Sequence, residues 1–502
     1  MNVNSEFFLE FMKPLLGGVW DFIKAIGNAL VKIFNLANYF DIVNKYNSEG
    51  KGVSVFVVIL AVLCLIILFG LLAFLIYRMV KRFIKYRHSL AHQEALVDEI
   101  DNLNNDIVKL KSENQKYLEM TDPNKGEIEY DENGNIVNKL KEGESRFFKL
   151  TKIDEKYANY VAPELHETIT LEQICEQFRN YSASKMGLYY TIDLIRLFIS
   201  AFASNRLIIL QGISGTGKTS LAYSFGYFIK NESTIASVQP SWRDSTEIFG
   251  YFNEFTKRFN ETEVLSKMYE AKYNNQIYVT VLDEMNISRV EYYFAEMLSI
   301  LELPSTDEWV IDLVPNSWDT DPKLLEDGRF KLPTNMWYIG TINNDDSTFM
   351  ITDKVYDRAM PINIDTKGVE FDAPETEALD ISATYFESLF AKAQKEHPVS
   401  EDTLNKIALM DDYVINHFRL AFGNRIVKQL KDFVPVYVAC GGKEIVAVDY
   451  LIANKILRKF DQLNLAYIRN EIDGFVEFLD QTFGEGVMVE CKAFLERLKK
   501  TI

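Results

Sequence analysis

A glycine-rich loop at Gly212–Thr219 restricts the fold of this chain more than any other feature of its sequence. The loop follows a short apolar run, Leu207–Leu210, and opens a segment with a helical pattern. The pattern GxxxxGK(S/T) in the order strand, loop and helix is typical of a phosphate-binding loop. Its glycines let backbone N–H groups turn toward a phosphate, and the helix adds its positive end. The sequence therefore predicts an α/β domain built around this loop.

Two side chains of the loop have chemistry suited to a triphosphate and its metal. Lys218 is expected to reach the β- and γ-phosphates, and the hydroxyl of Thr219 is expected to ligate Mg²⁺. The predicted nucleotide-binding residues are Gly212, Ser214, Gly215, Thr216, Gly217, Lys218, Thr219 and Ser220.

A second apolar run supplies the acidic residues that such a loop requires. Ile277–Leu282 is rich in β-branched residues and ends in Asp283 and Glu284. At this distance after the loop, we expect Asp283 to hold the metal and Glu284 to orient and deprotonate the attacking water.

Six motifs occur in one order along the chain, and together they resemble those of the AAA+ superfamily, within it the McrB-like and MoxR-like branch. The motifs are QGISGTGKTS, QPSWRDSTEIFGYFN, VLDEMNISRVEYYFAEMLSILE, YIGTINNDDS, DKVYDRAMPINI and FGNRIVKQL. They extend over about residues 190–461. The resemblance implies a three-layer α/β core at 161–365 and a helical lid at 366–502.

The resemblance also implies roles for several polar side chains. Asn343 is similar to a sensor residue that holds the lytic water, and Arg358 to an arginine finger that reaches a neighbouring subunit. Arg425 is similar to the sensor-2 arginine of the lid, and Arg289 to a residue at a subunit contact. For each arginine, a surface ion pair remains the alternative.

The activity that this family implies is hydrolysis of ATP, or of GTP, with Mg²⁺ in a homo-oligomeric ring, expected to be a hexamer. The energy of hydrolysis would be used to remodel or gate a partner protein. The resemblance to the McrB-like branch further implies a McrC-like activator and a role in a defence system. Alternatives are a scaffold that binds nucleotide with little turnover and a metabolic P-loop kinase.

Residues 53–77 predict a membrane segment. This run of 25 residues carries no charge, and as a helix it would measure about 37 Å, enough to cross a bilayer. Arg78, Lys81 and Arg82 follow it, which places the rest of the chain in the cytoplasm by the positive-inside rule. We therefore expect a single-pass membrane protein, with a helix at 53–80 in contact with lipid; a buried core helix is the alternative.

The remaining N-terminal segments have weaker patterns. Residues 1–52 include an amphipathic stretch that is expected to lie at a membrane interface, although a packed hairpin or a second membrane pass would fit. Residues 89–120 show a heptad pattern that predicts a coiled-coil stalk or an amphipathic helix. Residues 121–160 are rich in turn formers and predict a linker with a β-hairpin.

The overall charge and the cysteines exclude other classes of function. The formal charge of −18 repels phosphate backbones, so direct binding of nucleic acid is not expected. The four cysteines show no spacing typical of zinc sites or of a disulfide framework.

Overall fold

The computed structural model describes residues 140 and 143–501, except 164–166, 255, 344–347 and 464, together with scattered positions between 17 and 81. It divides the chain into two units, 1–126 and 127–502, and each is described by itself.

In the first unit the described residues between 17 and 32 are helical, and helix α2 comprises Leu36–Ser48. The predicted coiled coil and hairpin lie outside the described residues, as does almost all of the predicted membrane segment. Among the described residues, no helix is both long and apolar enough to span a bilayer.

The predicted membrane location is therefore wrong for the part of the chain that the structure describes. Helix α17 (Leu465–Phe483) illustrates why a long helix of the described residues fails this criterion, because it is amphipathic. Its buried residues, among them Ile468, Ile472 and Phe475, recur at helical spacing, and charged residues such as Arg469 lie between them.

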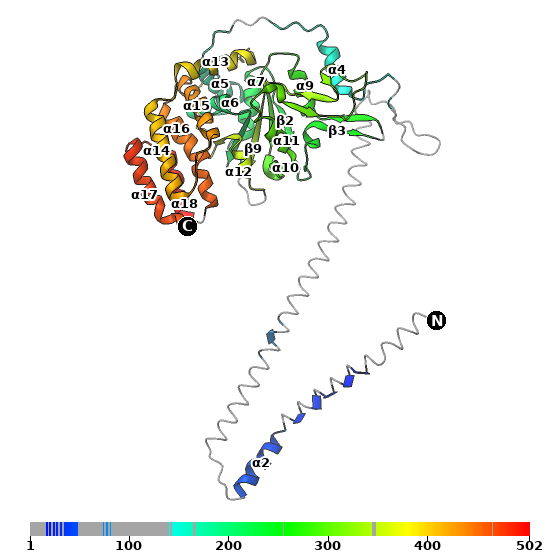
Figure 1. The fold of residues 1–502 in the computed structure, drawn as a ribbon, viewed down its shortest axis with the longest axis vertical. Coiled ribbons are helices and arrows are strands. Elements are labelled where there is room, and N and C mark those ends of the chain that lie inside the picture. The colour runs from blue at the N-terminus through cyan, green and yellow to red at the C-terminus, as the bar shows by residue number, and fades with distance from the viewer. Residues whose placement is uncertain are drawn as a thin grey trace, which may run out of the picture. The chain divides into compact units, whose positions relative to one another are not determined.

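A five-stranded parallel sheet forms the centre of the second unit, in the strand order β10-β1-β9-β5-β2 (Figure 1). The strands are β1 (Leu207–Gly212), β2 (Thr234–Ser237), β5 (Tyr278–Asp283), β9 (Met336–Asn343) and β10 (Ala359–Asn363). Because all five are parallel, the residues that follow them meet at one edge of the sheet.

Alternate side chains of β1 enter two different cores. Ile208 and Leu210 pack with helices α5 (Leu171–Met186), α6 (Ile192–Ser204) and α7 (Lys218–Phe228). Leu207 and Ile209 pack on the other face. The helices of that face are α4 (Phe148–Tyr157), α8 (Thr246–Phe249), α9 (Glu263–Ala271), α10 (Val290–Tyr293) and α11 (Ala295–Ile300). Burial on both faces is the reason for the continuous apolar runs in the sequence, and the predicted α/β class is confirmed.

Short elements complete this domain. They are the hairpin β3 (Gly250–Asn253) and β4 (Arg258–Glu261), the sheet of β6 (Val310–Asp312), β7 (Leu325–Glu326) and β8 (Arg329–Lys331), the 3-10 helices Met285–Ile287 and Thr306–Glu308, and α12 (Asp353–Tyr356). Arg146 and Asp321 form a buried ion pair at 2.7 Å that fixes the start of the domain against the β6–β8 region.

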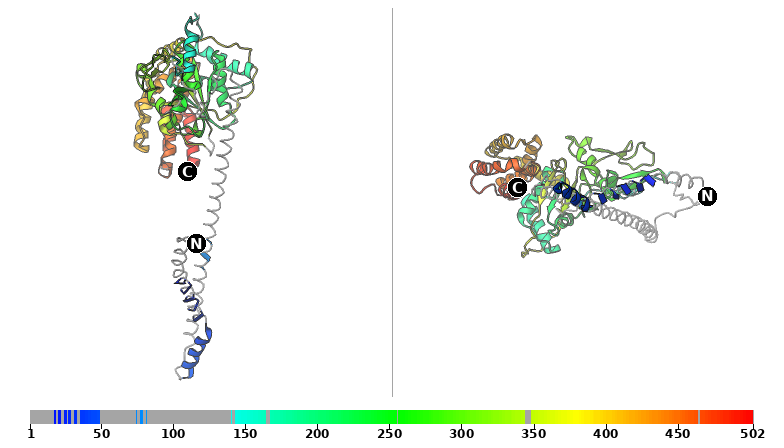
Figure 2. Two further views of the ribbon diagram at one scale, coloured as in Figure 1. Left: turned by 90° about the vertical axis from the view of Figure 1, so that its right-hand side faces the viewer. Right: turned by 90° about the horizontal axis from the view of Figure 1, so that it is seen from below.

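The chain after residue 382 is helical and gathers at one side of the sheet domain (Figures 1 and 2). The helices are α13 (Ala383–Glu396), α14 (Glu401–Phe418), α15 (Asn424–Ala439), α16 (Glu444–Lys455), the 3-10 helix Leu457–Gln462, α17 and α18 (Val489–Thr501). Ser382 and Ser400 cap α13 and α14 by accepting backbone N–H groups. This bundle shares one continuous core with α5, α6 and α7.

Candidate nucleotide-binding site

The loop between β1 and α7 has a backbone that requires glycine. Gly212, Gly215 and Gly217 have φ values of 145°, 77° and 93°. A Cβ atom added to Gly212 would lie 2.4 Å from the carbonyl oxygen of Ile364. Gly212 is therefore required where the end of β10 approaches the loop, whereas a Cβ atom added to Gly215 would meet nothing within 4 Å. The positive φ values let the loop turn its backbone N–H groups toward a ligand, as a phosphate cradle needs.

Contacts within the loop hold it in a defined shape. The Nζ of Lys218 donates to the carbonyl oxygens of Gly212 at 3.1 Å and Ile213 at 2.7 Å, and the Thr216 hydroxyl donates to Ile213 O at 2.9 Å. The Tyr190 hydroxyl donates to Gly217 O at 3.1 Å, and burial raises the pKa of Tyr190, so the donor keeps its proton. Ser214 is exposed at the turn of the loop, and Ser220 is half-buried in α7.

The end of β5 meets the start of α7 across the sheet edge. The Thr219 hydroxyl donates to Asp283 Oδ1 at 2.7 Å, and the Thr341 hydroxyl donates to the same oxygen at 2.8 Å. Thr341 lies on β9, which separates β1 from β5. Its hydroxyl also accepts the N–H of Glu284 at 2.8 Å, so one buried side chain orients both members of the acidic pair.

Glu284 leaves the strand in a left-handed conformation, with φ 53°. Such a conformation costs a non-glycine residue about 1–3 kcal/mol and is concentrated at functional sites. It brings the carboxylate within 3.4 Å of the Asn343 amide, which donates to Oε1. Asn286 fixes the neighbouring backbone by donating to Asn343 O at 3.0 Å.

The donor set fits a hydrated magnesium ion and a triphosphate. A hydroxyl and a carboxylate, Thr219 and Asp283, are adjacent, and both are the hard oxygen ligands that Mg²⁺ prefers. The glycine cradle and Lys218 lie beside them on the same edge of the sheet. The structure thus brings together the predicted phosphate loop, Asp283, Glu284 and Asn343.

Two other predicted site residues lie elsewhere. Arg358 precedes β10, and Leu207 pairs with Ala359, so Arg358 is at the edge of the sheet opposite the loop. The strand between the two edges measures roughly 17 Å. Both Arg358 and Arg425 form ion pairs with Glu302, at 2.8 Å and 2.7 Å. Arg289 packs its guanidinium over the Phe349 ring at 5.2 Å.

Sequence reasoning missed Thr341, Tyr190 and Glu302. The first lies within the motif YIGTINNDDS, but nothing local distinguishes its hydroxyl from that of other strand threonines. A further polar contact beside the loop was also missed: Arg458 donates to Gln211 Oε1 at 3.2 Å and stacks on Tyr356.

Comparison with known proteins assigns no family. No protein-family model and no curated protein matches the sequence. A full-length MCM homolog from Methanopyrus kandleri matches in structure with a TM-score of 0.32 and 10% sequence identity. The match covers 58% of this chain and 62% of that protein, so it extends over less than two thirds of the other protein's length. At this level of similarity it supports no conclusion about function.

Proposed function

We propose that this chain is a nucleoside triphosphate hydrolase of the AAA+ type that uses ATP and Mg²⁺. One observation carries the proposal: Thr219, Asp283, Glu284 and Asn343 converge beside a glycine cradle at one edge of a parallel sheet. Additional support comes from β9, which lies between the loop strand and the acidic strand, the strand arrangement of an AAA+ core.

The residues divide the work of hydrolysis between them. The loop N–H groups and Lys218 bind the phosphates, while Thr219 and Asp283 would hold the metal. Bound Mg²⁺ would supply charge stabilisation for the terminal phosphate. Glu284 accepts the proton of the attacking water, and the Asn343 amide, already directed at Glu284, orients that water.

The opposite edge of the sheet supports assembly. Arg358 lies too far from its own loop to reach a phosphate there, so a nucleotide phosphate that it contacts must belong to a second copy of the chain. We therefore propose a homo-oligomeric ring, with six subunits as the family suggests, in which hydrolysis drives a change in a partner protein. A McrC-like activator is the partner that the sequence resemblance favours.

The test is the variant Glu284→Gln. It should bind Mg²⁺-nucleotide as the wild type does and hydrolyse it at least about a hundredfold more slowly, because the general base is lost. Nucleotide binding and steady-state phosphate release measure the two properties.

The matched control is Glu232→Gln, an exposed glutamate in the turn before β2, which should hydrolyse normally. Unchanged turnover in Glu284→Gln would remove Glu284 as the base. A wild-type chain that binds and assembles but releases no phosphate would instead identify a nucleotide-dependent scaffold.

A further inference from the structure

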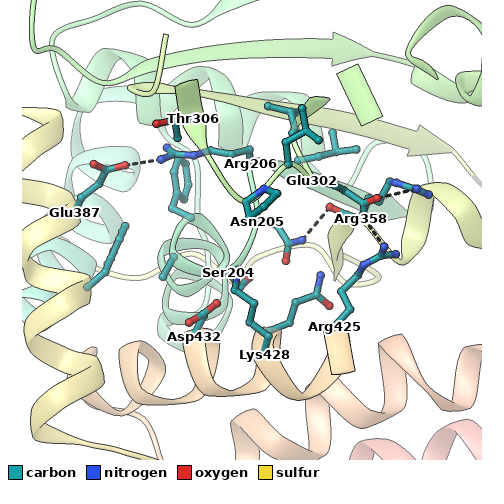
Figure 3. A pocket seen from close by; sticks show the side chains of 18 of the residues that line it. Ser204, Asn205, Arg206, Glu302, Thr306, Arg358, Glu387, Arg425, Lys428 and Asp432 are labelled. Carbon is teal, nitrogen blue, oxygen red and sulfur yellow. Dashed lines mark hydrogen bonds and ion pairs between the residues drawn. The ribbon is translucent and has the colours of Figure 1, made fainter. Parts of the chain in front are cut away.

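A cavity of about 730 Å³ lies at the edge of the sheet opposite the phosphate loop (Figure 3). Its walls come from the end of α6, the chain after α11, and the facing sides of α13 and α15. Figure 3 shows Arg358 and Arg425 approaching the Glu302 side chain from two different elements. This arrangement is separate from the candidate site at the loop.

One carboxylate holds both arginines. Glu302 contacts Arg358 at 2.8 Å through one oxygen and Arg425 at 2.7 Å through the other. The side chains are only partly covered, with 25% of Glu302 and 45% of Arg425 exposed. Solvent and a docking surface can therefore reach the three-residue cluster.

The cavity also contains buried polar atoms without a hydrogen-bond partner among the described residues. They are Asn205 Oδ1, Arg206 Nη1, Arg358 Nε and Gln429 Oε1. An unpaired buried donor or acceptor is costly and rare in a native fold. Two of the four atoms are acceptors and two are arginine donors, so the polar side chains around this cavity are incompletely satisfied in the isolated chain.

We propose that Glu302 is a latch that retains Arg358 and Arg425 within the isolated chain, and that the nucleotide phosphate of a second copy displaces it on assembly. The guanidinium group binds carboxylate and phosphate through the same fork of N–H donors, so the two anions compete for one pair of side chains. A terminal phosphate carries more negative charge than a carboxylate, so it displaces Glu302 from the arginines once two subunits are in contact. The inference rests on the proposed function, and it adds a step that controls when the arginines become available for hydrolysis.

Assembly requires the two ion pairs of Glu302 to break, so the latch makes assembly less favourable by the free energy of those ion pairs. Glu302→Gln removes its charge while keeping its size. The variant should reach half-maximal hydrolysis at a protein concentration about three- to tenfold lower than the wild type, because partly exposed ion pairs contribute modestly. Steady-state phosphate release is measured over a series of protein concentrations, with full-length protein and saturating Mg²⁺-ATP.

The matched control is Glu308→Gln, which removes the same charge from an exposed glutamate outside the arginine cluster. It should leave the concentration profile unchanged. A second variant, Glu302→Ala, should shift the profile in the same direction, and nucleotide binding by each variant shows that its own loop is intact.

The outcomes separate the two proposals. An unchanged or higher midpoint in Glu302→Gln, with an active wild type, would overturn the latch alone, because Glu302 would then be positioning the arginines or doing nothing. A wild-type chain that hydrolyses no nucleotide at any concentration would overturn the proposed function and the latch with it.

Discussion

Thr341 controls the geometry of the acidic pair with a single hydroxyl. It donates to Asp283 and accepts from the N–H of Glu284, and the side chain is almost fully buried. Second partners of this kind orient metal ligands and general bases, and their loss reduces metal affinity or activity by roughly 10- to 100-fold.

The variant Thr341→Val should therefore require a higher Mg²⁺ concentration and turn over roughly 10- to 100-fold more slowly. It should also lose about 1–3 kcal/mol of stability, because the Glu284 N–H is left without its acceptor. Hydrolysis titrated with Mg²⁺ and denaturant unfolding measure these effects. The matched control Thr280→Val removes a buried strand hydroxyl whose only partner among the described residues is the Met336 sulfur, and the Mg²⁺ requirement should not change. Equal effects in the two variants would contradict the role of Thr341.

At the scale of residues, the sequence predicted those contacts that follow from a local sequence pattern. Gly212, Lys218, Thr219 and the acidic pair are adjacent to recognisable strands, so their meeting could be predicted. The role of Thr341 could not, because it depends on β9 being placed between β1 and β5, a pairing that the chain order does not reveal.

At the scale of elements, a buried lysine is one of the α16 residues that connect the helical bundle to the sheet; Tyr450 and Asn454 also contact Asn363 of β10. Lys455, its last residue, donates from Nζ to the carbonyl oxygens of Tyr356 at 2.6 Å and Ala359 at 2.7 Å, with a longer contact to Asp357 at 3.3 Å. These carbonyls lie where α12 ends and β10 begins, next to Arg358. The lysine therefore fixes the bundle to the strand entry that carries the arginine.

The variant Lys455→Met should lower the free energy of unfolding by about 2–4 kcal/mol, because buried carbonyls lose their donor. The nearby Lys459→Met breaks a partly exposed ion pair with Asp357 and should cost only about 0–1 kcal/mol. Denaturant unfolding of both variants provides the comparison. A cost for Lys455→Met no greater than that for Lys459→Met would show that this contact is not important for docking.

The elements themselves were predicted with unequal success. Apolar runs identified β1 and β5, since each is specified by its own residues, whereas the later helices were expected from the family resemblance. The partners of Glu302 were not identified, because the bundle residue Arg425 and the strand-entry residue Arg358 are brought together only by tertiary packing.

At the scale of the whole molecule, the proposed function assigns complementary parts of one reaction to the two edges of the sheet. The cradle and the acidic pair lie at one edge, and Arg358 and Arg425 lie at the other. Under this proposal, each site needs a second copy of the chain to complete it.

Mixing two inactive variants tests this division. Arg358→Ala keeps an intact loop edge, and Glu284→Gln keeps an intact arginine edge. Each alone should hydrolyse at least about tenfold more slowly than the wild type, and an equimolar mixture should exceed the sum of the two, because one composite interface has all its groups. Phosphate release before and after mixing is the measurement, and Arg329→Ala, an exposed arginine outside the cavity, is the control. A mixture no more active than its components would contradict catalysis between subunits.

Helix α6 has a consequence for how the two edges act together. The Tyr190 hydroxyl, just before this helix, contacts the loop at Gly217, and Asn205, just after it, donates to the Arg358 carbonyl at 2.8 Å. Its 13 residues form a stiff rod about 20 Å long. We expect that nucleotide binding shifts the loop and that α6 transmits this shift to Arg358. Each subunit would then present its arginines to its neighbour according to whether its own loop holds nucleotide. Hydrolysis would therefore proceed from one subunit of an assembly to the next.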